Sequence, residues 1–266
     1  MDKFDALFEF DKRIFSVYGK LLSVKRIVKL LKHKPDLNKN KMMKDRRRSD
    51  RCFVLGLGPS LKEIDLCKLD GDIIVTNRFF MVDGADKVNP VAYVIVDGGF
   101  YDKKNCDDLN AAVKMFPKSC FVLNGLYSDR IDKDILSNTI VYNIYLWAGS
   151  IDGKRTKLDC RKVMPIAGNV ICAAEYIALY MGYREIFLLG CDFNSFASQK
   201  ANHVYKEEDT NRLWSISTEL FQYSFTADQH CQLDIYAKKH NQRILNLTQG
   251  SLIDAYEKLS CDKYIK

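Results

Sequence analysis

Short apolar runs, each bounded by glycine or by polar residues, constrain the fold of this chain more than any other feature. The clearest is the run at 52–56, which reads Cys-Phe-Val-Leu-Gly. Runs of this length and composition are typical of strands that are buried on both faces of a parallel sheet. The same pattern predicts further strands at 72–76, 92–96, 120–123, 140–142, 186–189 and 243–246.

Helical segments lie between these strands, and the clearest spans 170–181. Its apolar positions 170, 171, 174, 177, 178 and 181 form one stripe, and Gly182 follows as a stop signal. Strands that alternate with helices predict an α/β fold with a mainly parallel, Rossmann-like sheet and helices on both faces. A chain of 266 residues has room for one such domain and an appendage.

The positive charge of the chain is concentrated at its N-terminus. Residues 1–51 contain 16 Lys and Arg against 7 Asp and Glu, a net charge of +9, whereas the whole chain carries +7. The remaining residues therefore sum to −2, and a nucleic-acid-binding domain would need a basic surface of its own. We predict a basic helical arm and linker at 1–50, a catalytic domain at 51–266, and no nucleic-acid partner.

The arm combines apolar residues at near-helical spacing with many lysines. A basic amphipathic helix can lie on an anionic membrane surface, or it can pack on the domain or on a second protomer in a homo-oligomer. No run approaches the roughly 20 apolar residues of a membrane span, and no signal peptide is evident. We expect a cytoplasmic protein, with peripheral contact to the inner membrane as one role of the arm. The apolar positions are Ile14, Phe15, Val17, Tyr18, Leu21, Leu22, Val28 and Leu31.

Nine cysteines are scattered along the chain without a Cys-x-x-Cys pair. An odd number at irregular spacing argues against a disulfide framework or a zinc ribbon and indicates a reducing compartment. Most of these cysteines are expected to be small buried hydrophobic residues. We predict no resident metal site from them.

The loop after the first strand reads Gly56-Leu57-Gly58-Pro59-Ser60. Ligands of open parallel sheets bind beyond the carboxyl ends of the strands. Glycines there allow the backbone to approach a phosphate closely, and Ser60 could donate its hydroxyl or cap a helix. The alternative is an ordinary tight turn, because the segment matches neither a Walker loop nor a complete Gly-x-Gly-x-x-Gly motif.

Three further polar residues follow predicted strands. Asn77 could bind a ribose or a base edge, or form an Asx turn. Asp97 and Asp192 could hold a divalent metal, contact ribose hydroxyls or cap the next helix. Among the histidines, His203 lies on a loop soon after Asp192, and a neutral imidazole is suited to removing a proton from a hydroxyl. His230 is the second choice for that role.

Several of these segments together resemble the bacterial sialyltransferases of glycosyltransferase family 42. That family carries Gly-Asn-Gly-Pro-Ser-Leu where this chain has 56–61, and an Asn before aromatic residues that corresponds to Asn77. Its small-residue-Gly helix start and following strand are similar to Ala167-Gly168 and to 182–193, which reads GYREIFLLGCDF. The resemblance covers about residues 51–258.

The chain also resembles the broader MptE-like group, which includes an archaeal 6-hydroxymethylpterin diphosphokinase and proteins of surface-polysaccharide clusters. That group has an Asp at the position of Asp97, an Asn-His-aromatic loop similar to Asn202-His203, and a late segment similar to 243–251. Leu57 and Asp97 depart from the sialyltransferases, which carry Asn at both positions. Their phosphate-binding aromatic pair has only Phe196 and Tyr205 as stand-ins here.

The resemblance implies a GT-A-like single domain that transfers a sugar, most closely sialic acid or a related acidic sugar from a CMP-activated donor, to lipopolysaccharide or another bacterial surface glycan. It requires no cofactor, although Mg²⁺ is compatible with the acidic residues. Two alternatives stay open: a metal-dependent diphosphokinase that uses ATP, with Asp97 and Asp192 as magnesium ligands, and a non-catalytic nucleotide-binding subunit. The implied catalytic residues are His203 and Asp97, and the implied nucleotide-binding residues are Gly56, Gly58, Pro59, Ser60, Asn77, Gly168, Asn169 and Asp192.

Overall fold

A computed structural model describes most of the chain. The described residues are 36–102, 106–131, 133–137, 139–146, 149–198, 203–205 and 215–264, together with 10, 13, 14, 17, 24 and 28 of the arm. Most of the predicted arm and Asn202 lie outside these residues. The described arm positions are helical, and their large apolar side chains are exposed.

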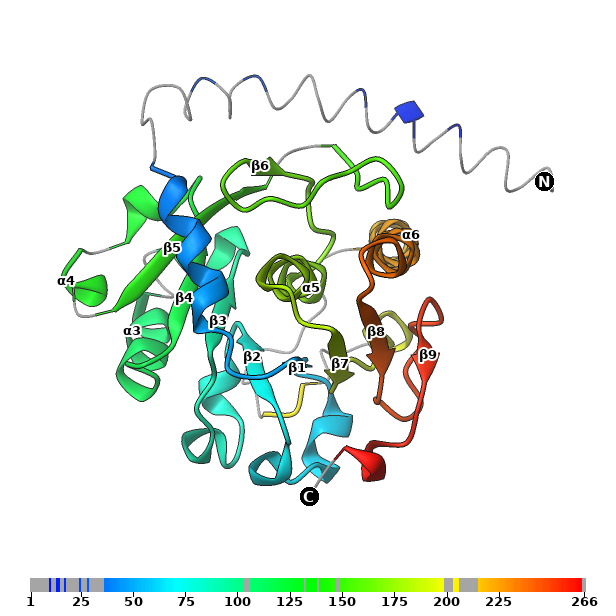
Figure 1. The fold of residues 1–266 in the computed structure, drawn as a ribbon, viewed down its shortest axis with the longest axis horizontal. Coiled ribbons are helices and arrows are strands. Elements are labelled where there is room, and N and C mark those ends of the chain that lie inside the picture. Colours follow the sequence, from blue (N-terminus) through cyan, green and yellow to red (C-terminus); the bar gives the residue numbers. More distant parts are fainter. Residues whose placement is uncertain are drawn as a thin grey trace.

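The described chain forms one nine-stranded sheet in which every pairing is parallel. Its order is β6-β5-β4-β3-β2-β1-β7-β8-β9. The chain therefore builds the sheet outwards from β1 in one direction and then returns to add β7 on the other side of β1 (Figure 1). The strands are β1 (Arg51–Leu55), β2 (Asp72–Thr76), β3 (Ala92–Ile95), β4 (Cys120–Asn124), β5 (Ile140–Leu146), β6 (Val163–Met164), β7 (Glu185–Leu189), β8 (Arg243–Asn246) and β9 (Glu257–Lys258).

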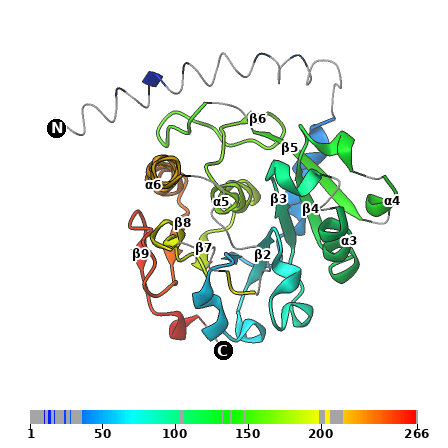
Figure 2. The ribbon, with the colours of Figure 1, turned by 180° about the vertical axis from the view of Figure 1, so that it is seen from behind.

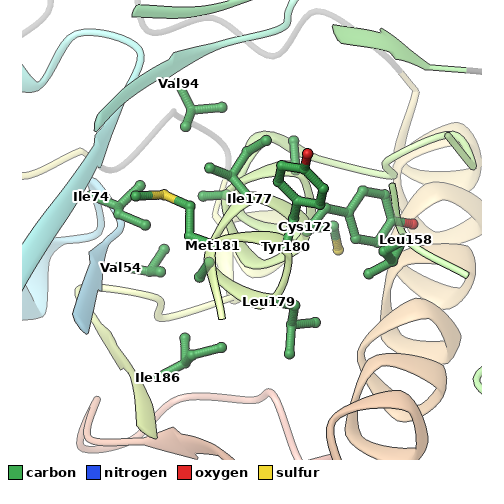
Figure 3. Packing of buried hydrophobic residues seen from close by; sticks show 14 of the residues in the cluster. Val54, Ile74, Val94, Leu158, Cys172, Ile177, Leu179, Tyr180, Met181 and Ile186 are labelled. Atoms are coloured by element: carbon green, nitrogen blue, oxygen red, sulfur yellow. The ribbon is translucent and has the colours of Figure 1, made fainter. Parts of the chain in front are cut away.

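Helices cover both faces of this sheet (Figures 1 and 2). One face packs against α5 (Val170–Met181) and α6 (Ile216–Lys239), and the other packs against α3 (Cys106–Met115), beside which lies the short α4 (Lys133–Leu136). Alternate strand residues enter the two cores because side chains of a strand point to opposite faces. Val54 thus packs with α5, as Figure 3 shows, whereas Leu55 belongs to the α3 side.

The predicted α/β fold is confirmed, and each predicted strand lies within or overlaps one of β1–β5, β7 and β8. The helix predicted at 170–181 has those bounds because Asn169 caps its start and Gly182 ends it at a φ of 88°. It was expected to bury one stripe, but every residue of 172–181 is buried since α5 lies between the sheet and α6. The two-residue strands β6 and β9 were not predicted.

The segment predicted as a polar linker contains part of the core. Asn38–Arg46 forms a 3₁₀ helix in which Met43 is fully buried among core residues. The side chain of Asn40 donates to the backbone oxygens of Asn143 and Cys160 over 2.8 and 2.7 Å. The folded body therefore includes residues 38–46, which precede the predicted boundary at 51. Among the described helices, none is both long enough and apolar enough to cross a membrane.

Candidate functional site

The reversal of strand order places a ligand-binding position between β1 and β7. Open parallel sheets bind ligands at such a reversal because the loops after the two strands diverge there. The loop after β1 stays close to the loop after β7: the amide of Gly56 donates to Leu189 O over 2.7 Å, and that of Gly58 donates to Gly190 O over 2.9 Å. Two loops 130 residues apart in the sequence thus form one surface.

Glycine is required at 56 and 58 by this close approach. A Cβ at Gly56 would lie 2.3 Å from the backbone oxygen of Gly190, and one at Gly58 would lie 1.9 Å from a carboxylate oxygen of Asp192. Gly190 itself has a φ of 66°, which side chains rarely adopt. The glycines predicted to accommodate a phosphate therefore also bring the β1 loop against Asp192.

The side chain of Ser60 takes part in the contact between the two loops and does not cap the 3₁₀ helix in which it lies. Its hydroxyl donates to Asp192 over 2.7 Å, and the short 3₁₀ helix Pro59–Glu63 has no side-chain hydrogen bond at its start. Ser60 lies outside the pocket between the loops and contributes to a separate one on the β8 and β9 side. In the structure Ser60 therefore contacts Asp192, and its direct contact with a nucleotide stays a prediction.

A pocket of about 190 Å³ opens between the two loops and the start of α5. It brings together most of the sequence-predicted residues from five separate segments of the chain. It also includes side chains that sequence reasoning did not assign to the site, among them Tyr223 of α6. The predicted residues that line it are Gly56, Gly58, Pro59, Asn77, Asn169, Asp192 and His203, and the additional ones include Thr76, Val170, Ile171, Cys191, Phe193, Ser195, Tyr223 and Ile253.

Asn77 has an unusual backbone and an unused side-chain oxygen. Its φ is 47°, a left-handed value, and its backbone oxygen accepts from the hydroxyl of Tyr93 over 2.6 Å. Its Oδ1 is buried and finds no hydrogen-bond partner within the described part of the chain. Because a buried amide oxygen without a donor is costly, a ligand that donates to Oδ1 would be favoured here.

The N-terminus of α5 faces the pocket. The side chain of Asn169 accepts from the amide of Cys172 over 2.8 Å, so Asn169 is the cap of the helix. Val170 and Ile171 of the first turn line the pocket. Amides of a first helical turn lack intrahelical acceptors and carry partial positive charge, which attracts anions.

Gly168 is not available for the contact predicted for it. Its amide donates to the side chain of Gln229 over 2.6 Å, and its carbonyl accepts from Gln222 over 3.1 Å. Both partners belong to α6, so Gly168 holds this helix against the start of α5. A Cβ at this position would lie 2.5 Å from the hydroxyl oxygen of Thr226, which explains the glycine.

Asp97 belongs to a neighbouring pocket of about 390 Å³. Its exposed carboxylate accepts from the amide of Gly99 over 2.9 Å and caps the 3₁₀ helix Gly98–Tyr101. Asn77, Asn169 and Val170 line this second pocket as well as the first, so the two spaces adjoin at these residues. Asp97 and Asp192 line different pockets and thus do not form the shared carboxylate pair on which the magnesium hypothesis rests.

His203 reaches the pocket, and His230 does not. The amide next to His203, on Val204, donates to Leu57 O over 2.8 Å, which fastens this segment to the β1 loop. The imidazole of His203 stacks on Tyr205 with ring centroids 5.1 Å apart. His230 has no exposed surface. Burial therefore prevents His230 from contacting a substrate hydroxyl.

An aromatic group that includes Phe193 and Tyr223 borders the pocket. Phe193, with a left-handed φ of 57°, packs on Tyr223 with ring centroids 4.5 Å apart, and Phe196 meets the same ring at 4.9 Å. The hydroxyl of Tyr223 is hydrogen-bonded to that of Ser195. Of the two expected aromatic stand-ins, Phe196 joins this group. Nothing in the sequence near Tyr223 marks it as a pocket residue, because only the packing of α6 brings it there.

No family model and no curated protein matches this chain. Among solved structures, it is similar to the sialyltransferase CstII from Campylobacter jejuni in complex with cytidine-5'-monophosphate, at 16% identity and a TM-score of 0.48, over 79% of this chain and 84% of that one. The alpha-2,3-sialyltransferase Cst-I from the same organism gives 16% identity and 0.49, over 82% of each chain. The MAf glycosyltransferase from Magnetospirillum magneticum AMB-1 gives 13% and 0.48, over 85% of this chain and 38% of that one. Because the identities and TM-scores are this low, the activity of this chain has to be inferred from its own site.

Proposed function

We propose that this chain is a glycosyltransferase that moves a sugar from a nucleotide-activated donor to a bacterial surface glycan, and that the donor is a CMP-activated acidic sugar. The observation that carries the proposal is the pocket between β1 and β7. It combines closely packed glycines, an unpartnered amide oxygen, a helix N-terminus and a histidine. Its loop and strand motifs are also those that resemble the sialyltransferases.

Each part of the pocket has a role in this reaction. The phosphate of the donor would lie at the first turn of α5, where the amides of Val170 and Ile171 favour negative charge. Asn77 Oδ1 would accept from the exocyclic amine of a cytosine or from a ribose hydroxyl. One oxygen of Asp192 is held by Ser60, which leaves the other to accept from the ribose.

The transfer itself needs a base and a stabilised leaving group. The acceptor hydroxyl would lose its proton to the imidazole of His203 while its oxygen bonds to the anomeric carbon of the donor. The bond from that carbon to the phosphate oxygen breaks, and the nucleotide leaves with the electron pair. Charge that develops on the phosphate would be stabilised by the α5 amides. No magnesium ion is needed in this scheme.

A nucleotide panel tests the proposal. CMP, CDP, UDP, GDP and ATP are compared for their effect on the melting temperature, each with and without Mg²⁺. A ligand at about a hundredfold excess over its Kd stabilises the folded state by about 2.7 kcal/mol, so the preferred nucleotide should be evident. We expect CMP or CDP to raise the melting temperature most, with no need for Mg²⁺.

The panel also separates the alternatives. Stabilisation by ATP with Mg²⁺ alone would favour the diphosphokinase and contradict our proposal. Stabilisation by CMP without any release of CMP from CMP-activated sugars, tested with several glycan acceptors, would indicate a non-catalytic nucleotide-binding subunit.

A further inference from the structure

A buried polar cluster lies between α5 and α6, and none of its side chains lines the pocket between the two loops. It consists of Cys172 and Glu175 on α5, His230 on α6 and Tyr256, and each of these side chains is buried. His230 Nε2 lies 3.8 Å from the sulfur of Cys172, and Nδ1 lies 3.1 Å from both Glu175 Oε2 and the hydroxyl of Tyr256. The proposed reaction uses none of these groups.

The carboxylate of Glu175 is poorly satisfied. It has no exposed surface, and neither oxygen accepts a hydrogen bond within the described chain. Its polar neighbours are the imidazole of His230, whose Nδ1 lies 3.1 Å from Oε2, and the hydroxyl of Tyr256. A buried carboxylate is costly unless a positive charge beside it compensates its own, and a bound metal ion would provide such a charge.

We propose that Cys172, Glu175 and His230 form a buried zinc site. One ligand atom from each residue lies within 4.8 Å of the other two. Two ligands on one tetrahedral zinc, with Zn–S of about 2.3 Å and Zn–N of about 2.0 Å, lie about 3.6 Å apart. The observed 3.8 Å between Sγ and Nε2 is close to this separation. A thiolate, an imidazole and a carboxylate together favour zinc over magnesium or calcium.

The surroundings complete the site. When Nε2 binds a metal, the other ring nitrogen usually donates to a hydrogen-bond partner that fixes the ring. The hydroxyl of Tyr256 and Oε2 of Glu175 both lie 3.1 Å from Nδ1, so Glu175 would bind the metal through Oε1. Phe193 packs edge-on against the imidazole with ring centroids 5.7 Å apart. The zinc would join the first turns of α5 to α6, and so fix the helix start and the aromatic group that line the pocket, without contact to substrate.

The metal content of the full-length protein, purified without added metal or an affinity tag that binds metal, tests the proposal. Inductively coupled plasma mass spectrometry should show about one zinc ion per chain. After removal of zinc by a chelator under mild denaturant, zinc should restore the original melting temperature. Cobalt(II) should restore it as well and give a sulfur-to-cobalt charge-transfer absorption that reports the Cys172 ligand.

Variants assign the ligands. Cys172→Ser should abolish the charge-transfer absorption, and Glu175→Gln should retain it while weakening zinc affinity about a hundredfold or more, beyond the 10- to 100-fold typical of second-shell changes. Cys160→Ser is the matched control, because Cys160 is equally buried but lies outside the cluster. It should bind zinc and cobalt as the parent protein does.

Three results would overturn the proposal. They are absence of bound zinc together with no effect of added zinc on the melting temperature, a charge-transfer absorption that survives in Cys172→Ser, and its loss in Cys160→Ser. If Cys172→Ser does not fold, the cobalt spectrum of the parent protein and the weakened affinity of Glu175→Gln still decide. None of these readouts depends on nucleotide binding or sugar transfer, so the proposed function can fail while the zinc site stands.

Discussion

The hydroxyl of Ser60 donates a hydrogen bond of 2.7 Å to the carboxylate of Asp192. The two residues lie 132 positions apart in the sequence, but they follow β1 and β7, which are neighbours in the sheet. This hydrogen bond joins the loops after β1 and β7, where the strand order reverses. It also orients Asp192, the only carboxylate among the described residues that line the pocket.

Ser60 and Asp192 should therefore act on nucleotide affinity as a coupled pair. We expect Asp192→Asn to weaken nucleotide binding about tenfold, and Ser60→Ala to weaken it less because Ser60 acts through Asp192. The double variant should be weaker than the parent by less than the sum of the two effects, with a coupling energy of about 0.5–3 kcal/mol. Isothermal titration calorimetry of the parent, the two single variants and the double variant measures the nucleotide affinities of this double-mutant cycle. Additive effects would show that Ser60 does not orient Asp192.

Gly58→Ala should remove nucleotide binding. The new Cβ would lie 1.9 Å from the Asp192 carboxylate, so the loops after β1 and β7 would have to separate. We expect a lower melting temperature and no stabilisation by CMP, both measured by thermal unfolding. Gly99→Ala is the control, since its Cβ would meet its nearest neighbour, an Asp97 oxygen, at an ordinary 3.5 Å. Unchanged CMP binding in Gly58→Ala would place the nucleotide elsewhere.

His203→Ala should lower kcat by about a hundredfold or more, within the 10²–10⁴-fold range of general-base catalysis, and should leave nucleotide-induced stabilisation intact. His240→Ala, at the exposed end of α6, is the control and should have near-parental activity. Steady-state kinetics with a CMP-activated sugar measure both. A variant at His203 that keeps its kcat would exclude His203 as the base, and if His230→Ala is active as well, Asp97 would be the next residue to test.

Asp97→Asn should weaken the activity without abolishing it, and the parent protein should need no added Mg²⁺. Asp97 caps a short helix and faces the second pocket, where it could contact an acceptor but does not share a site with Asp192. Rates are compared with and without Mg²⁺ in metal-free buffer. Asp102→Asn, an exposed change outside both pockets, is the control. A strict requirement for Mg²⁺ that Asp97→Asn removes would favour a diphosphokinase.

The arm should bind anionic vesicles. Residues 1–37, which precede the 3₁₀ helix of the folded body, contain 9 Lys and Arg against 5 Asp and Glu, a net charge of +4. Each Lys or Arg near an anionic surface contributes about 1 kcal/mol. Ile14 and Val17 are exposed on the arm, so Ile14→Asp with Val17→Asp should abolish cosedimentation with phosphatidylserine vesicles at low salt. The control is Met115→Asp with Ile216→Asp, which changes two exposed apolar residues of the body. Failure of the parent protein to bind would assign the arm to packing or oligomerisation.

Local sequence was sufficient for seven of the nine strands and for the ends of α5. A run such as that of β1 is buried whichever strands lie beside it, so its apolar composition predicts it directly. Asn169 and Gly182 fix the ends of α5 through bonds and backbone angles within a few residues. The loop from Gly56 to Ser60 could likewise be recognised from a few residues as part of a site. Its glycines indicate that another part of the protein or a ligand comes close to the backbone, even before that partner is known.

The partners of these residues were decided only by the tertiary structure. The sequence does not specify that β7 returns beside β1, and that order alone brings Asp192 to Ser60. Burial likewise separates His203 from His230, and the packing of α6 on α5 brings His230 to Cys172 across 58 residues of sequence. Local patterns determine which helices and strands form, because the interactions that stabilise them lie within a few residues. Contacts between distant residues depend instead on the order of the strands and the packing of the helices, and these are determined by the chain as a whole.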